Sequence, residues 1–471
     1  MNFSTMSSMI VKELSSKLGE QVNPAMSIEM ANQIDLWQRM YSDQNNKAKD
    51  TVGIPAAIAS EIARLTTLEM KVSVTGSDLA DRMQKSIDNL RKTIRVKAEV
   101  GCALGGMVIK PYFNGDEIKT EFIPANDFYP IGFSGDELTE CVFIEQLFHG
   151  KFILTRMEVH WLKGTTLNVY NWAYQSTISS TLGSEIKLSS VPEWAGLSEF
   201  VTIHNVKKLP FGYFKVPMAN QEQNESPIGV SVYAKAVKQI EIANQRYGQV
   251  NWEFEAKEAA VHISEDALKM NPETDKPEVP KGKERLYRVV QFHTGATDKP
   301  FLDVFSPEIR DESMYNGLNR QLRLIEFNSN LAYGTLSDPN NTDKTATEIN
   351  ASKQRSYQFI SDVQIALEDA IRDYLEAIRF YADLYGFGGD YDVQFYWDDS
   401  MITDANTEQL LDMQKVQLGV MPKFRFIMKW EGVDEKTAKQ WLQEVKEENK
   451  SDPEELNPFG FRTSKEDEGD E

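Results

Sequence analysis

Cysteine and histidine are scarce in this chain of 471 residues. Its two cysteines, Cys102 and Cys141, exclude a disulfide framework and a zinc site built from several thiolates. The histidines are too widely spaced for a zinc-hydrolase motif; they are His149, His160, His204, His262 and His293. We expect them to be ordinary strand or surface residues, and we expect neither a metal nor a cofactor.

Long hydrophobic runs are also missing. No run approaches the roughly 18 apolar residues of a membrane helix. Residues 1–20 lack the basic and apolar regions of a secretory signal. We therefore expect a cytosolic protein without membrane contact. Hydrophobic residues make up 41 %, enough for a sizeable core, and the length suggests about three compact units.

Positive charge is the third shortage. The chain carries 51 Lys and Arg against 72 Asp and Glu, which gives a net charge of −21. Duplex DNA is bound largely through Lys and Arg side chains that neutralise phosphates. No block of five or six basic residues occurs along the sequence. We therefore expect any contact with DNA to be loose or repulsive.

Motifs for nucleotide and ester hydrolysis are absent. Gly101 and Gly106 have the glycine spacing of a phosphate-binding loop, but the Lys-Ser/Thr pair that would hold phosphates and magnesium does not follow. We expect these glycines to let a helix end turn into a strand at Met107. No G-x-S-x-G elbow occurs, so an α/β-hydrolase is unsupported.

One carboxylate cluster could carry chemistry: Asp390, Asp392, Asp398, Asp399 and Asp404. Paired acids can hold two magnesium ions for phosphodiester cleavage. Asp392 and Asp398 are separated by an even number of positions, so they could share one face of a strand. The alternative is that these acids merely flank a half-buried strand, and no basic substrate groove accompanies them.

The pattern of apolar residues predicts an α+β chain. The first 100 residues are expected to be helical, and Ile54–Met70 shows apolar spacings of three and four. From Gly101 to about Phe214, short strand-like runs alternate with turns. Asn114-Gly115-Asp116 between two such runs is a hairpin signal.

Two long helices are expected next. Ser226-Pro227 and Ser306-Pro307 each place a capping residue before a proline, which is typical of a helix start. Between these helices, residues 259–305 are expected to form a small β unit.

A polar loop follows the second helix, from Gly334 to Asp343. It is either a simple connector or a functional loop displayed on a rigid scaffold. Thr345 and Glu348 then fit a capping box. The helix that they open is expected to reach Gly386, about 60 Å if unbroken, and needs a lateral partner to cover its apolar stripe. A strand at Tyr391–Trp397 and three shorter helical segments are expected after it.

Four parts of the chain resemble the portal proteins of tailed bacteriophages, particularly those of long-tailed siphophages. They are Gly105–Tyr112 with Ile123–Ile131, Leu209–Gly212 leading to Ser226–Gly229, Gly334–Ser337 with Lys344–Ile349, and Gly419–Lys423 with Trp430–Gly432 and Ala438. The resemblance spans about residues 30–450, and the Thr345-Ala346-Thr347-Glu348 junction is its most specific element.

The resemblance implies a phage portal fold with long stem and wing helices. By position it assigns residues 1–226 to a wing of N-terminal helices and an α+β part, 227–258 to the first stem helix, 259–305 to a β-containing clip, 306–331 to the second stem helix, 332–344 to a tunnel loop, 345–400 to the long wing helix and the following strand, 401–450 to a helical crown, and 451–471 to an acidic, disordered tail.

The resemblance also implies a DNA-facing site in the tunnel loop. Its residues would be Tyr333, Gly334, Thr335, Leu336, Ser337, Asp338, Asn340, Asn341, Thr342, Asp343 and Lys344, with Thr345 and Glu348 as the helix cap behind them. Only Lys344 is basic in this loop. A grip on phosphates is therefore not expected of it.

The function implied by the resemblance is structural, not enzymatic, with no catalytic residues. About twelve subunits would form a ring at one capsid vertex of the virion, after synthesis in the host cytoplasm. Double-stranded viral DNA would pass through the ring without sequence specificity during packaging and ejection. Twelve subunits would carry a charge near −252, which would keep the DNA sliding.

The implied partners are the large terminase subunit, a head completion or connector protein, the scaffold protein and the major capsid protein. Two alternatives stay open at this point. One is a metal-dependent nuclease that uses the Asp392–Asp404 cluster, and the other is a helical adaptor that forms no ring.

Overall fold

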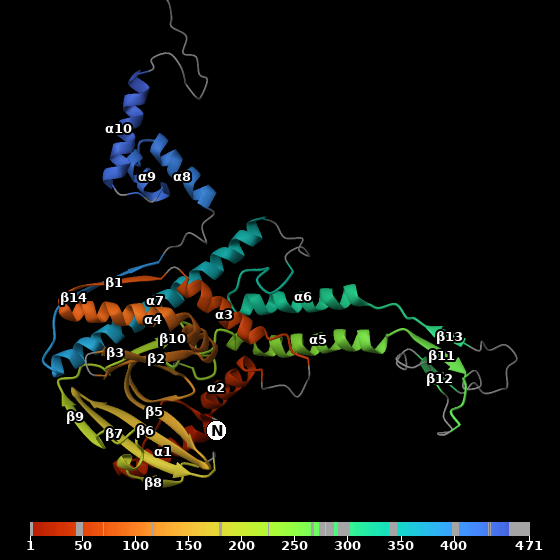
Figure 1. The fold of residues 1–471 in the computed structure, drawn as a ribbon, viewed down its shortest axis with the longest axis horizontal. Coiled ribbons are helices and arrows are strands. Elements are labelled where there is room, and N and C mark those ends of the chain that lie inside the picture. The colour runs from red at the N-terminus through yellow and green to blue at the C-terminus, as the bar shows by residue number, and fades with distance from the viewer. Residues whose placement is uncertain are drawn as a thin grey trace, which may run out of the picture. The chain divides into compact units, whose positions relative to one another are not determined.

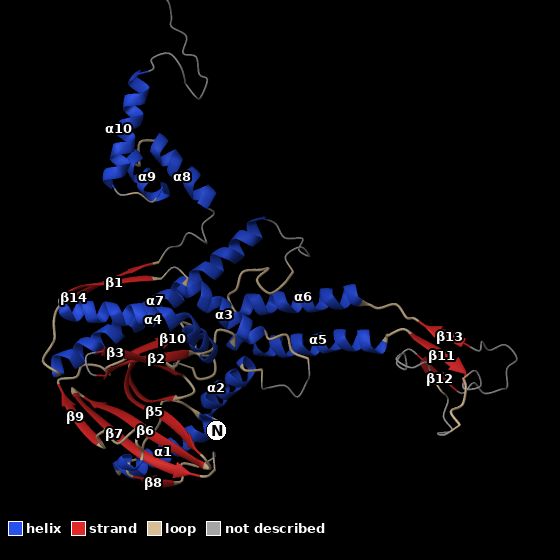
Figure 2. Cartoon of the chain, in the orientation of Figure 1, coloured by secondary structure: helices blue, strands red, loops and turns tan. Residues whose placement is uncertain are grey.

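The computed structural model describes residues 3–43, 50–68, 70–114, 117–178, 181–224, 226–264, 268–272, 278, 287–290, 302–338, 346–397, 405–431, 433 and 435–451. The chain divides into two compact units, Met1–Trp397 and Asp398–Glu471. Helices and strands are mixed in the first unit, as the α+β prediction requires (Figure 2). No helix in the described ranges is long and apolar enough to span a bilayer.

Four helices begin the first unit: α1 (Phe3–Leu18), α2 (Ile28–Tyr41), α3 (Ile54–Thr67) and α4 (Asp78–Leu104). Their apolar residues recur at helical spacing and form one continuous core with α7. The prediction of a wholly helical first 100 residues was wrong at one place, because Lys71–Gly76 form strand β1. This strand pairs with a segment more than 300 residues away, so local sequence patterns do not reveal it.

An antiparallel six-stranded sheet forms one layer of this unit. It contains β4 (Phe128–Ser134), β5 (Glu137–His149), β6 (Phe152–Lys163), β7 (Thr166–Ser176) and β8 (Ser184–Ile186) in that order, and β9 (Phe200–His204) also pairs with β7. The single-turn helix η1 (Leu188–Ser190) follows β8. The strand-like runs expected between Gly101 and Phe214 are confirmed by these strands.

A second sheet joins β2 (Gly106–Asn114), β3 (Glu117–Pro124) and β10 (Gly212–Lys215) in the order β10-β2-β3. Asn114 pairs with Glu117, so the predicted hairpin is confirmed. Gly105 ends α4 with a φ of +96°, a left-handed conformation that suits glycine. The predicted turn from helix to strand is therefore also confirmed.

The segment after Ser226 corrects a prediction. The helix begins only at α5 (Val237–Ala256), after a short turn η2 (Ala234–Ala236). The residues before it are buried in the core instead, and the backbone N–H of Val232 donates to the carbonyl of Cys102 at 3.0 Å. The apolar segment between Ser226 and α5 is buried against the end of α4, and this burial outweighs the helix start that Ser226-Pro227 favours locally.

Helices α5 and α6 (Asp311–Asn328) lie side by side, and a small sheet stands at their far end (Figure 1). This sheet has the order β12-β11-β13 and contains β11 (Ala260–Ser264), β12 (Tyr287–Val290) and β13 (Leu302–Phe305), which confirms the predicted β unit. Helix α6 starts at Asp311 rather than at Ser306, because β13 runs to Phe305 and residues 306–310 form neither helix nor strand.

Helix α7 (Ala346–Leu384) is 39 residues long, close to the predicted length. Its stripe, including Leu367, Ile371 and Tyr374, is fully buried. Strand β14 (Tyr391–Tyr396) follows and pairs antiparallel with β1. The first and last strands of this unit therefore pair with each other.

The second unit consists of α8 (Ala405–Gln417), α9 (Lys423–Glu431) and α10 (Glu435–Ser451), which confirms the three predicted helical segments. The carboxylate of Asp412 accepts hydrogen bonds from Lys415 and Lys429, both at 2.7 Å, and so ties α8 to α9. The pKa of Asp412 is lowered to about 2 by these two bonds. The predicted tail after residue 451 lies outside the described residues.

Candidate functional site: the segment after helix α6

The segment that follows α6 is wrapped around one carboxylate. Glu326, near the end of α6, is completely buried. Its Oε1 accepts backbone N–H bonds from Gly334 (3.1 Å), Leu336 (2.6 Å) and Ser337 (2.8 Å). Its Oε2 accepts the hydroxyl of Ser337 at 2.8 Å. Backbone amides that converge on an anion in this way supply the compensation that a buried charge needs.

Two further hydrogen bonds and the Arg355 guanidinium hold the same segment. The backbone N–H of Asp338 donates to Oδ1 of Asn319 on α6 at 2.7 Å, and that of Tyr333 donates to Oγ of Ser352 on α7 at 2.9 Å. The Arg355 guanidinium lies 4.5 Å from the ring centre of Phe327 and 5.7 Å from that of Tyr333. The first half of the loop is therefore fixed to both helices.

The predicted loop site divides between described and undescribed residues. Tyr333, Gly334, Thr335, Leu336, Ser337 and Asp338 are described, and none of them is basic. Asn340, Asn341, Thr342, Asp343, Lys344 and Thr345 lie outside the described residues. Glu348 lies on α7, but its side chain is not described, so the predicted capping box stays a prediction.

The outer faces of α5 and α6 carry large apolar side chains in solvent. Trp252 is 67 % exposed, Leu324 53 % and Phe327 52 %. A hollow of about 310 Å³ also lies on α6, where Tyr315, Leu318 and Leu322 line it together with Asp338 from the segment after the helix. Large apolar side chains exposed on two neighbouring helices are suited to contact with another protein surface.

An ionic clamp joins the far ends of the two helices. The guanidinium of Arg310 donates to Glu253 through Nε at 3.0 Å and Nη2 at 2.9 Å, and Lys257 lies 2.6 Å from the same carboxylate. These bonds, that of Arg310 first, lower the pKa of Glu253 to about 2. The clamp holds the start of α6 against the end of α5.

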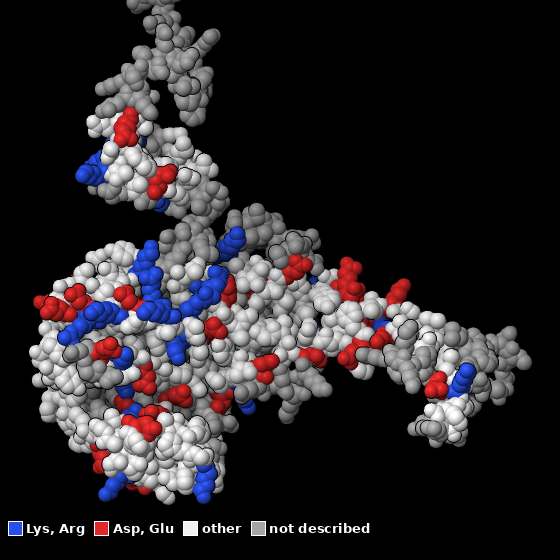
Figure 3. Space-filling model, in the orientation of Figure 1, with Lys and Arg blue, Asp and Glu red and all other residues white. Residues whose placement is uncertain are grey.

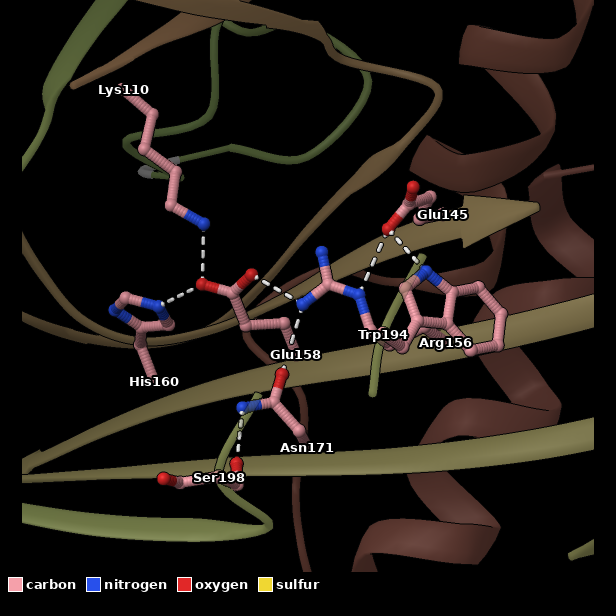
Figure 4. Close-up of polar contacts among 8 residues, drawn as sticks. All are labelled: Lys110, Glu145, Arg156, Glu158, His160, Asn171, Trp194 and Ser198. Atoms are coloured by element: carbon pink, nitrogen blue, oxygen red, sulfur yellow. Dashed lines mark hydrogen bonds and ion pairs between the residues drawn. The ribbon is translucent and has the colours of Figure 1, made fainter. Parts of the chain in front are cut away.

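A second ionic cluster lies on the six-stranded sheet (Figure 4). The buried carboxylate of Glu158 accepts from Lys110, from Nε2 of His160 at 2.6 Å and from Arg156 at 2.9 Å. Arg156 also donates to Glu145 and to Asn171, both at 2.9 Å. Every charge has a partner here, so the cluster is a structural network that joins β2 to β5, β6 and β7.

The pKa values in this cluster follow from burial and charge. Burial alone would raise the pKa of Glu158, but Lys110, His160 and Arg156 hold it well below its usual range. Burial lowers the pKa of His160. Two permanent cations already balance Glu158, so a third positive charge on the imidazole is disfavoured. His160 is thus a core strand residue, as the sequence suggested for the histidines.

The predicted acidic cluster is only partly described. Asp392 is exposed on β14 and accepts a bond from Gln394, whereas the backbone carbonyl of Asp390 accepts from Ser77. Asp398, Asp399 and Asp404 lie outside the described residues. Within the described ranges, no group of three or more His, Cys, Asp or Glu is placed to hold a metal ion.

Sequence reasoning missed Glu326 as the anchor of the loop. The signal that could have found it is a carboxylate on the apolar face of an amphipathic helix, directly before a glycine-containing turn. A charge at such a position must find partners inside the protein.

The chain is similar to known proteins over most of its length. A family model described as "Phage portal protein, SPP1 Gp6-like" matches residues 38–451. A search of curated proteins found no match. The matched region includes most of the first unit and all the described residues of the second.

Proposed function

The chain belongs to the SPP1 Gp6-like family of phage portal proteins, and from this premise we propose that its subunits close into a ring through which viral DNA passes. The family is structural, so the role is that of a phage portal at a capsid vertex rather than that of an enzyme. The ring and loop assignments are argued from contacts and exposed surfaces of the described residues, and the others from chain order and the family role.

The observation that carries the ring proposal is the exposed apolar surface of α5 and α6. Burial of the exposed side chains of Trp252 and Leu324 against another subunit would be favourable. The hollow at Tyr315 could receive an apolar side chain from a neighbouring copy. A heterologous contact of this kind generates a ring when its rotation closes. By this proposal α5 and α6 are the stem helices, and twelve copies form the ring.

The remaining assignments follow from chain order. We assign β11–β13 to the clip, which would meet the large terminase subunit during packaging and a head completion or connector protein afterwards. We assign α7 to the wing, the unit α8–α10 to the crown, and contacts with the scaffold and major capsid proteins to the outer surface. These partners are proposals from the family role.

The segment after α6 is assigned to the channel. Its first half is anchored by Glu326, so α6 and the loop would move together when the stem is displaced. This anchor separates residues 333–338, which hold the loop in place, from residues 339–343, which would face DNA. No basic side chain occurs between Tyr333 and Asp343, so DNA would slide past rather than be held.

A deletion tests the loop assignment. Removal of residues 339–343 leaves all contacts of Glu326 intact, unlike a deletion that starts at Leu336. We expect ring assembly to persist while the amount of DNA packaged per capsid falls. Loss of ring assembly on this deletion would overturn the assignment. A matched control is removal of residues 453–457 from the acidic tail, which should leave packaging unchanged.

A further inference from the structure

A hollow of about 570 Å³ lies where the six-stranded sheet and the β10-β2-β3 sheet meet the end of α7. We call it the sheet hollow. Its volume falls within the range of about 300–1,000 Å³ that is usual for small-molecule sites. Figure 3 shows acidic side chains gathered around a hollowed part of this face. The sheet hollow shares no lining residue with the segment after α6 or with the outer faces of α5 and α6.

Aromatic rings line part of the sheet hollow. They come from β2, from the segment after η1 and from the end of α7, and they are Tyr112, Phe113, Trp194, Tyr381 and Tyr385. The rings of Phe113 and Tyr381 pack edge to face with their centres 6.1 Å apart, and Trp194 is almost fully buried. Apolar and aromatic surface with a few well-placed polar groups is typical of ligand pockets. This lining is suited to a large apolar group of a ligand.

The ionic network around Arg156 forms the polar part of the hollow, and it leaves hydrogen-bonding groups unused. The guanidinium donates only through Nε and Nη1, to Glu145, Glu158 and Asn171 (Figure 4). Its Nη2 has no acceptor among the described residues. On Glu145, Oε2 accepts from Arg156 at 2.9 Å and from the indole of Trp194 at 3.1 Å, while Oε1 accepts from no described residue. An unused donor and an unused acceptor therefore belong to two side chains that contact each other.

The other charged groups of the hollow decide the charge of a ligand. Lys110 is paired with Glu158, and Glu193 lies 3.8 Å from Nε2 of His149. Glu121 has no partner among the described residues. The lining thus holds four carboxylates and two permanent cations, namely Glu121, Glu145, Glu158, Glu193, Lys110 and Arg156. A simple anion would meet the excess of negative charge, and a simple cation would leave Nη2 of Arg156 without an acceptor.

A ligand with both charges matches this arrangement. The carboxylate and the ammonium of an α-amino acid are bonded to one carbon, so they can reach two neighbouring protein groups of opposite charge. Hydrogen bonds between charged groups are also stronger than those between neutral ones. We propose that the sheet hollow binds a small zwitterion with a large apolar group, which is the chemistry of a free α-amino acid such as phenylalanine.

Each part of such a ligand has its own contact. The carboxylate accepts from Nη2 of Arg156, the ammonium donates to Oε1 of Glu145, and the apolar group lies against the aromatic lining. The site depends neither on ring formation nor on DNA. Because a ligand that binds only the folded state stabilises it, occupancy should also raise the melting temperature of the chain.

Three probes that share a phenyl ring test the proposal on the full-length chain. Phenylalanine carries both charges, phenethylamine only the ammonium and hydrocinnamate only the carboxylate. Isothermal titration calorimetry measures their affinities. We expect phenylalanine to bind at least about tenfold more tightly than either of the others, because each of them lacks one hydrogen bond to a charged group. The proposal is overturned if phenylalanine does not bind near its solubility limit, or if either single-charge probe binds equally well.

Two conservative variants assign the two contacts. Arg156→Lys keeps a cation beside Glu158 but removes Nη2, so it should reduce the advantage of phenylalanine over phenethylamine. Glu145→Gln keeps an acceptor oxygen but removes the charge, so it should reduce the advantage of phenylalanine over hydrocinnamate. If both variants fold and neither ratio changes, the zwitterion binds elsewhere and the proposal is wrong.

Glu137→Gln is the matched control. Glu137 is exposed on β5, the strand of Glu145, but lies eight positions away, which is about 27 Å along a strand. Its replacement removes the same charge and should leave all three affinities within about twofold, since salt screens charges over that distance. Circular dichroism checks the fold of each variant, and the three probes on wild type decide the proposal even where a variant does not fold. The ring is tested by native mass without any probe, so the two proposals fail independently.

Discussion

The carboxylate of Glu326 accepts a hydrogen bond from the backbone N–H of Leu336 at 2.6 Å, and this bond joins the second long helix to the loop after it. The same oxygen also serves Gly334 and Ser337. The group is completely buried, and every hydrogen bond that its carboxylate accepts from the described residues comes from this loop. The position of the loop is therefore fixed by a side chain of α6.

Replacement of Glu326 tests this coupling. Glu326→Ala leaves three backbone donors without their acceptor, and each buried unpaired donor costs about 1–3 kcal/mol until the segment opens to water. We expect the amides of Leu336 and Ser337 to exchange much faster with deuterium, while those in the centre of α7 stay protected. Hydrogen exchange followed by mass spectrometry measures both.

Glu326→Gln is the matched control, since it keeps one acceptor oxygen and the same shape. Its exchange should fall between that of wild type and Glu326→Ala. Unchanged protection in the alanine variant would show that other contacts hold the loop.

The ionic cluster around Glu158 predicts acid sensitivity. The pKa of His160 is lowered by burial, so the unfolded chain binds a proton near pH 6.5 that the folded protein does not. Stability is then constant above this pH and falls by up to about 1.4 kcal/mol per pH unit below it. The lowered pKa of Glu158 adds a further loss at pH values below about 4.

His160→Gln isolates the histidine contribution. The amide can still donate to Glu158 but does not titrate. We expect the melting temperature of the variant to change less than that of wild type between pH 7.5 and pH 5.5, with His204→Gln, at an exposed histidine, as the control. Equal pH dependence of His160→Gln and wild type would assign the acid sensitivity to other groups.

The close contact between Gly229 and Gly105 predicts that only glycine is tolerated at position 229. A Cβ placed on Gly229 would collide with the carbonyl oxygen of Gly105. Gly229→Ala should therefore lower the free energy of unfolding by at least about 2 kcal/mol, through forced backbone shifts. Denaturation by urea measures this change.

Gly317 offers the control for that substitution. It lies inside α6, and a Cβ added to it would meet nothing within 4 Å, so Gly317→Ala should be neutral or stabilise by up to about 1 kcal/mol. If both alanine variants behave alike, close packing at Gly229 is not the reason for glycine there.

The exposed apolar residues of α5 and α6 allow a test of subunit assembly. Trp252→Gln/Leu324→Gln should weaken contacts between subunits while the subunit stays folded, because neither side chain is needed in the core. Phe148→Gln, which removes a 71 % exposed ring on β5, is the control and should leave assembly unchanged. Sedimentation velocity at several concentrations distinguishes them.

Local patterns were sufficient for most elements. The hairpin at Asn114, the turn at Gly105 and the helix from 346 to 384 were predictable, because turn chemistry and helical periodicity are encoded within short windows. The order of these elements along the chain then indicated an α+β fold and the resemblance to a family.

The errors came from long-range contacts. Strand β1 is stabilised by β14, and the segment before α5 is buried against Cys102, so tertiary packing overrode the local helix signals in both places. The Glu326 anchor was missed for a related reason. It depends on which helix face the residue occupies, which a search for contiguous motifs does not consider.

The central claim is a ring, and the native mass of the purified chain tests it most directly. Twelve copies of 53.6 kDa would give about 643 kDa, and negative-stain images should show annular particles with a central hole. The Trp252→Gln/Leu324→Gln variant should shift this population toward single subunits. A wild-type protein that stays at 53.6 kDa at every concentration, with images free of annular particles, would contradict the account.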